Sequence, residues 1–355
     1  MERNLATIQL ISALDPITGA DKIEKATILG WECVVKKGDF AVGDKCIFIE
    51  IDSVLPAIPY WDFMAPRRYR VKTIRLRKQV SQGLAVPLKD LLELKDPKVG
   101  TDVTEILGIV KWESKSDRES NNMPRKKHGP IIKFLTRFSW YRKLTHTKSK
   151  SFPNWIAKTD ETRIQNLPWT DIYNKRKDET FYSSEKMDGQ SATYWYIPKM
   201  FLSEFGICSR SVRKFEMDNS NWSRAAKELK IKDKLKLYPN TAIQGELCGP
   251  GIQGNKYNFT EFKLFIFNVF DIKLKRYYDL HELEIFCLIA GLSMVPILSK
   301  KYKLKETVQE TIKDAIGEST FNHIKREGIV IRTHNQSISF KAINPEFLLK
   351  YEEEE

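Results

Sequence analysis

The chain has 355 residues, of which 41% are hydrophobic and 30% are charged. This composition excludes a disordered tail, and at roughly 100–200 residues per domain the length predicts two domains. The 59 Lys and Arg residues exceed the 46 Asp and Glu residues by 13, which favours a polyanionic partner, either a nucleic acid or an anionic membrane surface.

The first 114 residues are predicted to form a small β-rich domain. Stretches 31–35 and 45–51 are rich in apolar and β-branched residues and are separated by Gly-Asp turns. Stretch 67–78 holds seven cations and no anion. As one strand it would have a strongly basic face, and this suggests a five-stranded barrel of the oligonucleotide-binding (OB) type. The alternative is a solvated edge strand whose cations prevent aggregation. The predicted nucleic-acid contacts on this strand are Arg68, Arg70, Lys72, Arg75 and Arg77.

Segment 115–150 is predicted to be a basic linker. It contains eleven cations and two anions, and therefore carries +9 of the net charge of +13. Aromatic residues alternate with cations in its second half, a pattern that suits a nucleic-acid surface. Lys126 and Lys127 are its predicted contacts, and a polar linker without a binding role is the alternative.

The remaining region, 151–355, mixes strands and helices. Strands are predicted at 191–196, 242–247, 262–272, 328–332 and 338–343, and helices at 222–236, 280–292 and 304–316. The longest stretch without a charged residue, 285–299, has 15 residues, whereas a membrane-spanning helix needs about 20. We therefore expect an α+β fold and no membrane partner.

The five cysteines are widely spaced and form no CxxC pair, and the five histidines show no metal-ligand spacing. These patterns argue against a disulfide scaffold and against a zinc site. They fit a reducing compartment, so a cytoplasmic location is expected.

The segment Glu185-Lys186-Met187-Asp188-Gly189 is the first of an ordered set of motifs. A lone KxDG is a weak signal, but the sequence continues with further stations in order. These are Ser209-Arg210, Gln244-Gly245-Glu246-Leu247, 267–272, Arg326-Glu327-Gly328 with the strand that follows, and Ser339-Phe340-Lys341-Ala342-Ile343. The set resembles the covalent nucleotidyltransferases, which comprise DNA ligases, RNA ligases and messenger RNA capping enzymes.

Two further segments narrow the resemblance. Residues 152–166, FPNWIAKTDETRIQN, and 245–255, GELCGPGIQGN, are similar to RNA ligases with an N-terminal OB-like domain, the group typified by the Deinococcus and Naegleria enzymes. The resemblance implies an N-terminal OB-like β-barrel (1–114), a basic linker (115–150) and a nucleotidyltransferase domain with antiparallel sheets and flanking helices (151–355). Only 14 residues follow Lys341, which leaves no room for the C-terminal OB domain that DNA ligases and capping enzymes usually carry.

The resemblance implies that Lys186 attacks the α-phosphorus of ATP and forms a lysyl-AMP. A lysine amine has a pKa near 10.4 and must lose its proton to act as a nucleophile. A neighbouring cation, Lys341, and a bound Mg²⁺ or Mn²⁺ are expected to lower the pKa of Lys186. Lys341 is also expected to hold the α-phosphate.

The remaining site residues are also assigned from the resemblance. Glu246 is expected to contact the ribose and Glu327 the metal, and both are candidate metal ligands. Arg210 is expected to contact ribose or phosphate, and Phe270 to stack on adenine. Glu185, Asp188 and Gly189 flank the nucleotide, with Gly189 allowing a tight turn. For Phe270 the alternative is a core position, since it lies in an apolar strand.

These assignments predict an ATP-dependent RNA ligase. It would join a 3′-hydroxyl RNA end to a 5′-phosphate end through lysyl-AMP and an adenylylated polynucleotide, in the repair of nicks in RNA or RNA–DNA duplexes, and it would act as a monomer. The alternatives are a capping guanylyltransferase, a DNA ligase, or a non-catalytic RNA-binding module.

Overall fold

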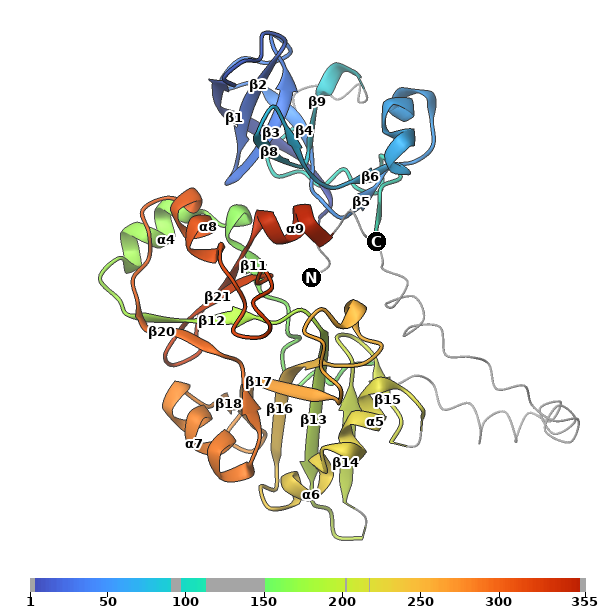
Figure 1. The fold of residues 1–355 in the computed structure, drawn as a ribbon, viewed down its shortest axis with the longest axis vertical. Coiled ribbons are helices and arrows are strands. Elements are labelled where there is room, and N and C mark those ends of the chain that lie inside the picture. The colour runs from blue at the N-terminus through green and yellow to red at the C-terminus, as the bar shows by residue number, and fades with distance from the viewer. Residues whose placement is uncertain (1–3, 91–96, 113–150, 202, 217, 352–355) are drawn as a thin grey trace, which may run out of the picture.

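The computed structural model describes residues 4–90, 97–112, 151–201, 203–216 and 218–351 (Figure 1). The predicted basic linker, with Lys126 and Lys127, lies outside the described residues. The domain boundaries at 114/115 and 150/151 stay predictions.

A five-stranded antiparallel sheet forms most of the N-terminal part. Its order is β3 (Trp31–Lys36), β2 (Ile23–Ile28), β1 (Ala6–Pro16), β4 (Lys45–Ile49) and β9 (Leu84–Pro87). The register of β1 shifts between Ile11 and Ala13, so this long strand bends and pairs with β4 through its first half and β2 through its second. A hairpin of β7 (Thr73–Leu76) and β8 (Gln79–Gln82) lies against β3, where the Val34 amide donates to Ser81 Oγ at 2.9 Å. The sheet thus curls around one core, as a small barrel requires.

Stretch 67–78 is not one strand, and this prediction was wrong. A 3-10 helix (Pro59–Arg67) ends at Arg68 and Tyr69, whose φ angles are positive. Short β6 (Arg70–Val71) then pairs with β5 (Ser53–Val54), which also pairs with β10 (Val110–Lys111). A second left-handed turn at Arg77 and Lys78 closes the β7–β8 hairpin. Because each turn redirects the side chains, the cations do not share one face.

The smaller C-terminal sheet carries the strand that ends at Lys186. Its order is β11 (Thr162–Arg163), β22 (Ser339–Ile343), β21 (Gly328–Thr333), β12 (Phe181–Lys186) and β20 (Ile297–Tyr302). The apolar face of this sheet packs against α4 (Trp169–Arg176), α8 (Val308–Ala315) and a 3-10 turn at Ile164–Asn166. Helix α8 begins after Thr307, which forms a capping box with Glu310.

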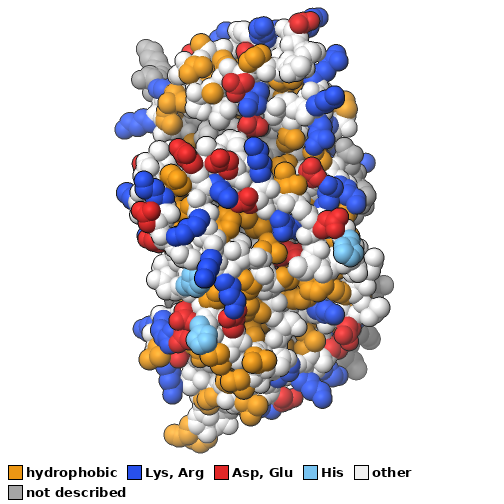
Figure 2. Space-filling model, turned by 60° about the vertical axis from the view of Figure 1, so that its left-hand side comes forward, with side chains coloured by type: hydrophobic (Ala, Val, Ile, Leu, Met, Phe, Trp, Pro, Cys, Tyr) orange, Lys and Arg blue, Asp and Glu red, His pale blue; other side chains and the backbone are white. Residues whose placement is uncertain are grey.

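The larger C-terminal sheet runs in the order β15 (Arg213–Lys214), β14 (Glu204–Cys208), β13 (Gln190–Ile197), β16 (Thr241–Cys248), β17 (Lys263–Asp271) and β18 (Arg276–Tyr277), with β19 (Ser293–Met294) beside β17. One face packs on α5 (Asn221–Glu228), α6 (Ile231–Lys236) and α7 (Leu280–Ala290). The predicted helix 222–236 is interrupted at Lys230, which has φ 53°. Figure 2 shows apolar side chains gathered on the lower part of one face of the molecule.

The C-terminal helix α9 (Pro345–Tyr351) joins the two parts of the chain. Its Phe347 and Leu348 belong to the core of the N-terminal sheet. Trp31 Nε1 donates to Asn166 Oδ1 at 2.5 Å, and Asn166 Nδ2 donates to Glu50 Oε1 at 2.8 Å. The smaller sheet therefore lies against the N-terminal domain, with α9 beneath the N-terminal strands in Figure 1.

The five cysteines are buried free thiols. Within the described ranges, the helices are all too short or too polar to cross a lipid bilayer.

Candidate active site

Lys186 is the last residue of β12, where the chain passes from the smaller sheet to the larger one. It pairs with Gly328 of β21, so the residue before that strand, Glu327, comes close. The turn that follows leads into β13, and a Cβ on Gly189 would lie 2.5 Å from the Leu247 carbonyl oxygen. Only glycine fits at this distance. The close approach brings β16, with Glu246, to the lysine.

Lys186 Nζ lies 2.5 Å from Glu327 Oε2, and both side chains are mostly buried. Burial alone would lower the pKa of Lys186, but the negative charges of Glu327 and Glu246 outweigh it, so the pKa is raised. The net direction set by the protein groups is therefore opposite to the lowering expected from Lys341. The lowering expected from a bound metal stays a prediction. The carboxylates that surround the amine hold it as an ammonium.

Lys341 lies on β22, opposite Val330 of β21, on the face that carries Lys186. Burial, with the positive charges of Lys186 and Arg163, lowers the pKa of Lys341 to about 8. The repulsion expected between the two lysines is thus present, but its effect falls on Lys341. This amine is a cation at neutral pH and loses much of its charge above pH 8.

Three carboxylates surround Lys186. Burial raises the pKa of Glu246 to about 8, with Lys186 opposing the shift and Glu327 adding to it. Burial and Glu327 raise the pKa of Asp188 to about 6, against the charge of Lys256. Over the residues that the structure describes, no three His, Cys, Asp or Glu side chains form a ready-made metal site. The assignment of Glu246 and Glu327 as metal ligands therefore stays a prediction.

Glu185 turns away from this cluster, since neighbouring residues of a strand point to opposite faces. Its buried carboxylate accepts hydrogen bonds from the amide and the hydroxyl of Thr320, both at 2.9 Å, and from Ser319. The structure does not support the predicted cofactor contact by this carboxylate, which instead fixes the segment before Glu327.

Phe270, on β17, and Arg210, in the turn between β14 and β15, both contact other side chains. Phe270 lies opposite Ala242, and its ring stacks on that of Trp155 at 6.2 Å between centroids. Arg210 forms an ion pair with Asp160 at 2.7 Å. Both partners belong to segment 152–163, so this segment covers the two predicted nucleotide contacts.

Arg70 is buried, and this does not support its predicted contact with a polynucleotide. Its guanidinium lies 3.3 Å from the ring centroid of Trp112 and 3.8 Å from Asp52 Oδ1. Arg68, Arg75 and Arg77 are exposed, and Lys72 is half-buried.

Residues 5–88 match an OB-fold domain family, and residues 179–351 match the RNA ligase family. A Naegleria gruberi RNA ligase variant without ligands is 31% identical, with a TM-score of 0.82 over 99% of both chains. The chain belongs to the RNA ligase family.

Further structures of the Naegleria gruberi RNA ligase are also similar to this chain over nearly its whole length. A variant solved with ATP and Mn is 32% identical, with a TM-score of 0.82 over 99% of this chain and 100% of that one. The enzyme with PPi is 32% identical, with a TM-score of 0.81 over the same shares. No curated protein sequence matches. The predicted fold, an OB-like N-terminal domain followed by a ligase domain with antiparallel sheets, is confirmed.

The ligase site contains ionic residues that the sequence reasoning did not single out. Arg332 of β21 is buried and pairs with Glu161 at 2.5 Å. Arg163 pairs with Asp52 of the N-terminal domain at 3.1 Å, and Lys256 pairs with Asp188 at 2.7 Å. Glu161 and Arg163 lie in segment 152–166, which resembles RNA ligases, so this resemblance could have identified both residues. No motif pointed to Lys256, which lies in the loop between β16 and β17, just after segment 245–255.

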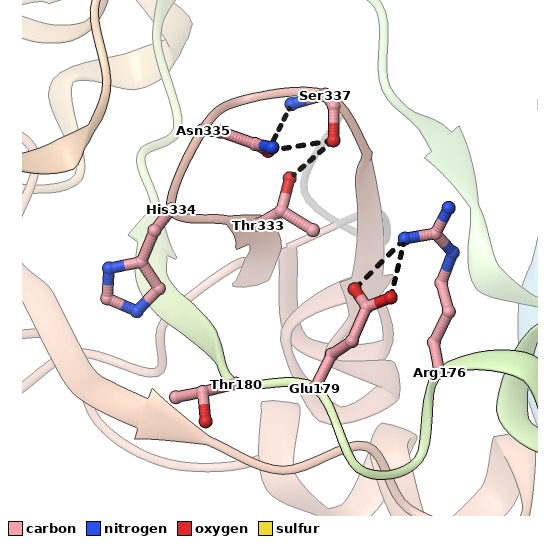
Figure 3. A pocket seen from close by; sticks show the side chains of 7 residues that line it. All are labelled: Arg176, Glu179, Thr180, Thr333, His334, Asn335 and Ser337. Carbon is pink, nitrogen blue, oxygen red and sulfur yellow. Dashed lines mark hydrogen bonds and ion pairs between the residues drawn. The ribbon is translucent and has the colours of Figure 1, made fainter.

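A pocket of about 420 Å³ lies elsewhere on the ligase domain (Figure 3). It is lined by the end of α4 and the β21–β22 turn, and Arg176 pairs with Glu179 inside it at 2.9 Å. None of Lys186, Glu246, Glu327 and Lys341 lines it. The pocket is therefore separate from the site formed by these four residues.

Glu246→Gln is expected to stabilise the ligase while impairing it. The folded pKa of about 8 exceeds the ordinary value of 4.5, so the unfolded chain releases this proton at lower pH than the folded one. Stability is therefore lost as pH rises from 4.5 to 8. A relief of roughly 1 kcal/mol corresponds to about 1–2 °C in the unfolding midpoint of a chain of 355 residues, because the entropy of unfolding grows with chain length. Thermal unfolding should show a higher midpoint for Glu246→Gln than for the wild type at pH 8 and no difference below pH 4.5. An equal gain at both pH values would contradict the raised pKa of Glu246.

Proposed function

We propose that the chain is an ATP-dependent RNA ligase that joins a 3′-hydroxyl end to a 5′-phosphate end. The observation that carries the proposal is the convergence of four side chains from two sheets. Lys186, Glu246 and Lys341 lie on β12, β16 and β22, and Glu327 immediately precedes β21. A relative that is 32% identical was solved with ATP and Mn, which supports the choice of nucleotide.

The first step is nucleotidyl transfer to Lys186. Its neutral amine attacks the α-phosphorus of ATP; a P–N bond forms, a P–O bond breaks, and pyrophosphate leaves. Glu327 Oε2, at 2.5 Å, orients the amine and accepts its hydrogen bond. Lys341, on the same face, supplies a cation for the α-phosphate at neutral pH.

A divalent cation fits the donor set. Glu246, Asp188 and Glu327 place more negative charge in a buried site than Lys186 compensates, and this surplus contributes to the raised pKa values of Glu246 and Asp188. Carboxylates are ligands that Mg²⁺ and Mn²⁺ prefer. When bound by Glu246 and Glu327, such an ion would neutralise phosphate charge and favour the neutral form of Lys186.

The nucleoside is proposed to bind under segment 152–163. For Phe270 to stack on adenine, Trp155 has to move from its present stacking distance, and Arg210 has to exchange Asp160 for ribose or phosphate. In the later steps AMP passes to the RNA 5′-phosphate, and a 3′-hydroxyl displaces it to seal a nick. The enzyme is proposed to act as a monomer.

Incubation with α-labelled nucleotide and Mn²⁺ or Mg²⁺ tests the proposal. The chain is expected to acquire label from ATP. Label from GTP alone would favour a capping guanylyltransferase, and no label at all would favour a non-catalytic RNA-binding module. Nicked duplexes that differ only in RNA or DNA at the 3′-hydroxyl strand separate an RNA ligase from a DNA ligase.

The exposed cations of the β7–β8 hairpin are proposed to contact RNA phosphates. Arg75→Gln and Arg77→Gln should each weaken RNA binding and reduce the slope of log affinity against log salt by about 1. Buried Arg70→Gln should instead lower the unfolding midpoint and leave the slope unchanged. Binding titrations at several salt concentrations measure both. If the Arg75 and Arg77 variants keep the wild-type slope, the RNA lies elsewhere.

A further inference from the structure

The loop between β16 and β17 contacts the turn that follows the nucleophile. Its Lys256 Nζ lies 2.7 Å from Asp188 Oδ2, and the side chains are only 13% and 15% exposed. The next residue, Tyr257, accepts a hydrogen bond from the Asp188 amide at its hydroxyl, at 2.8 Å. One loop therefore fixes both the backbone and the carboxylate of Asp188, two residues after Lys186.

The position of Lys256 is itself determined by several contacts. Its ammonium donates to the Gln253 carbonyl at 3.0 Å and lies 5.6 and 5.4 Å from the ring centroids of Phe347 and Tyr351. Both rings belong to α9, which packs into the core of the N-terminal domain. An ammonium near two rings and a carboxylate, with little access to water, has few other positions.

The charge balance of the cluster depends on this residue. Asp188, Glu246 and Glu327 surround a single cation, Lys186, and each adds to the field that holds it as an ammonium. Lys256 is a second cation and forms an ion pair with Asp188. Without it, Asp188 would have Lys186 as its alternative partner, and the nucleophile would be drawn into a second ion pair.

We propose that Lys256 is a positioning residue for the adenylylation step: it holds the Asp188 carboxylate in place and keeps it from pairing with Lys186. This inference rests on the proposed function. Lys256 forms an ion pair with Asp188, and it is through this carboxylate that it acts on the site.

The test measures the single-turnover rate of label transfer from α-labelled ATP in Lys256→Met, Lys256→Arg and a matched control, Lys263→Met. Lys263 also lies over an aromatic ring, 4.8 Å from the centroid of Phe259, but is not bound to Asp188. Lys256→Met should lose 10- to about 100-fold in maximal rate, as small displacements of catalytic groups do, with little change in the ATP concentration for half-maximal rate. Lys256→Arg should restore most of the rate, and Lys263→Met should match the wild type.

A double-variant cycle shows whether Lys256 acts through Asp188. Adding Lys256→Met to Asp188→Asn should cost little further rate, because the shared interaction is already gone. Equal losses in both backgrounds would overturn the inference, as would a wild-type rate for Lys256→Met or a change in half-maximal ATP alone, which would make Lys256 a nucleotide contact. Lys256→Gln replaces Lys256→Met if the latter does not fold. Wild-type protein that takes no label would instead refute the proposed function.

Discussion

Lys186→Ala is expected to abolish labelling by α-labelled ATP. Lys186 Nζ donates a hydrogen bond to Glu327 Oε2 at 2.5 Å, and removal of a covalent nucleophile costs at least about 1000-fold in rate. Lys186→Arg should fail as well, although it keeps the charge, because a guanidinium does not lose its proton at accessible pH. Gel analysis of labelled protein after denaturation measures the covalent product directly.

Lys175→Ala is the matched control, because Lys175 is an exposed lysine of α4. It should label like the wild type. Label that persists in Lys186→Ala would mean that another amine is adenylylated. Lys341 would then be the first candidate, since its pKa of about 8 leaves a larger neutral fraction at neutral pH.

The strands that carry the motifs could be predicted from the sequence because their residues alternate or run apolar over several positions. Stretches 242–247 and 328–332 correspond to β16 and β21, and 338–343 to β22. The turns and short strands of stretch 67–78 could not be predicted from such a pattern. Nothing in its composition reports the left-handed backbone at Arg68 and Tyr69, which tertiary contacts impose on residues that seldom adopt it.

Within the site, ordered motifs identified which residues converge but not how they pair. Lys186 ends β12, and Glu327 immediately precedes the neighbouring strand β21. The direction in which the pKa of Lys186 shifts, however, depends on its distances to three carboxylates. Strand alternation could have excluded the Glu185 side chain, because it immediately precedes the nucleophile. Burial of Arg70 could not be foreseen, since it depends on Trp112, 42 residues later in the chain.

The contact between the domains bears on the same site. Asp52 of the N-terminal domain accepts from Arg163 at 3.1 Å, and the charge of Arg163 is one cause of the lowered pKa of Lys341. Arg163 on β11 lies opposite Lys341 on the parallel neighbouring strand β22. The N-terminal domain therefore contributes to the electrostatics of the nucleotide site through one ion pair, in addition to its proposed contacts with RNA.

Glu327→Gln separates two effects of one carboxylate. As the partner of Lys186, Glu327 raises the pKa of the nucleophile, so its loss should favour the reactive neutral amine. As a candidate metal ligand, it also helps to bind the ion that stabilises phosphate charge. We expect the second effect to dominate and the maximal labelling rate to fall by about 100-fold, the usual cost of removing one electrostatic contact to a transition state.

The pH profile distinguishes these effects. The reaction needs neutral Lys186 and charged Lys341, and the pKa of Lys186 is the higher of the two. The falling limb at high pH therefore reports Lys186 and should move to lower pH in Glu327→Gln. The rising limb should level off near pH 8, where further loss of the proton from Lys186 is offset by loss of charge from Lys341. This limb should stay in place, because the shift of the Lys341 pKa arises from burial, Lys186 and Arg163 rather than from Glu327. Glu318→Gln, at an exposed position before the same motif, should leave both limbs and the rate unchanged. A falling limb that does not move would show that Glu327 does not hold the proton of Lys186, whatever the loss in rate.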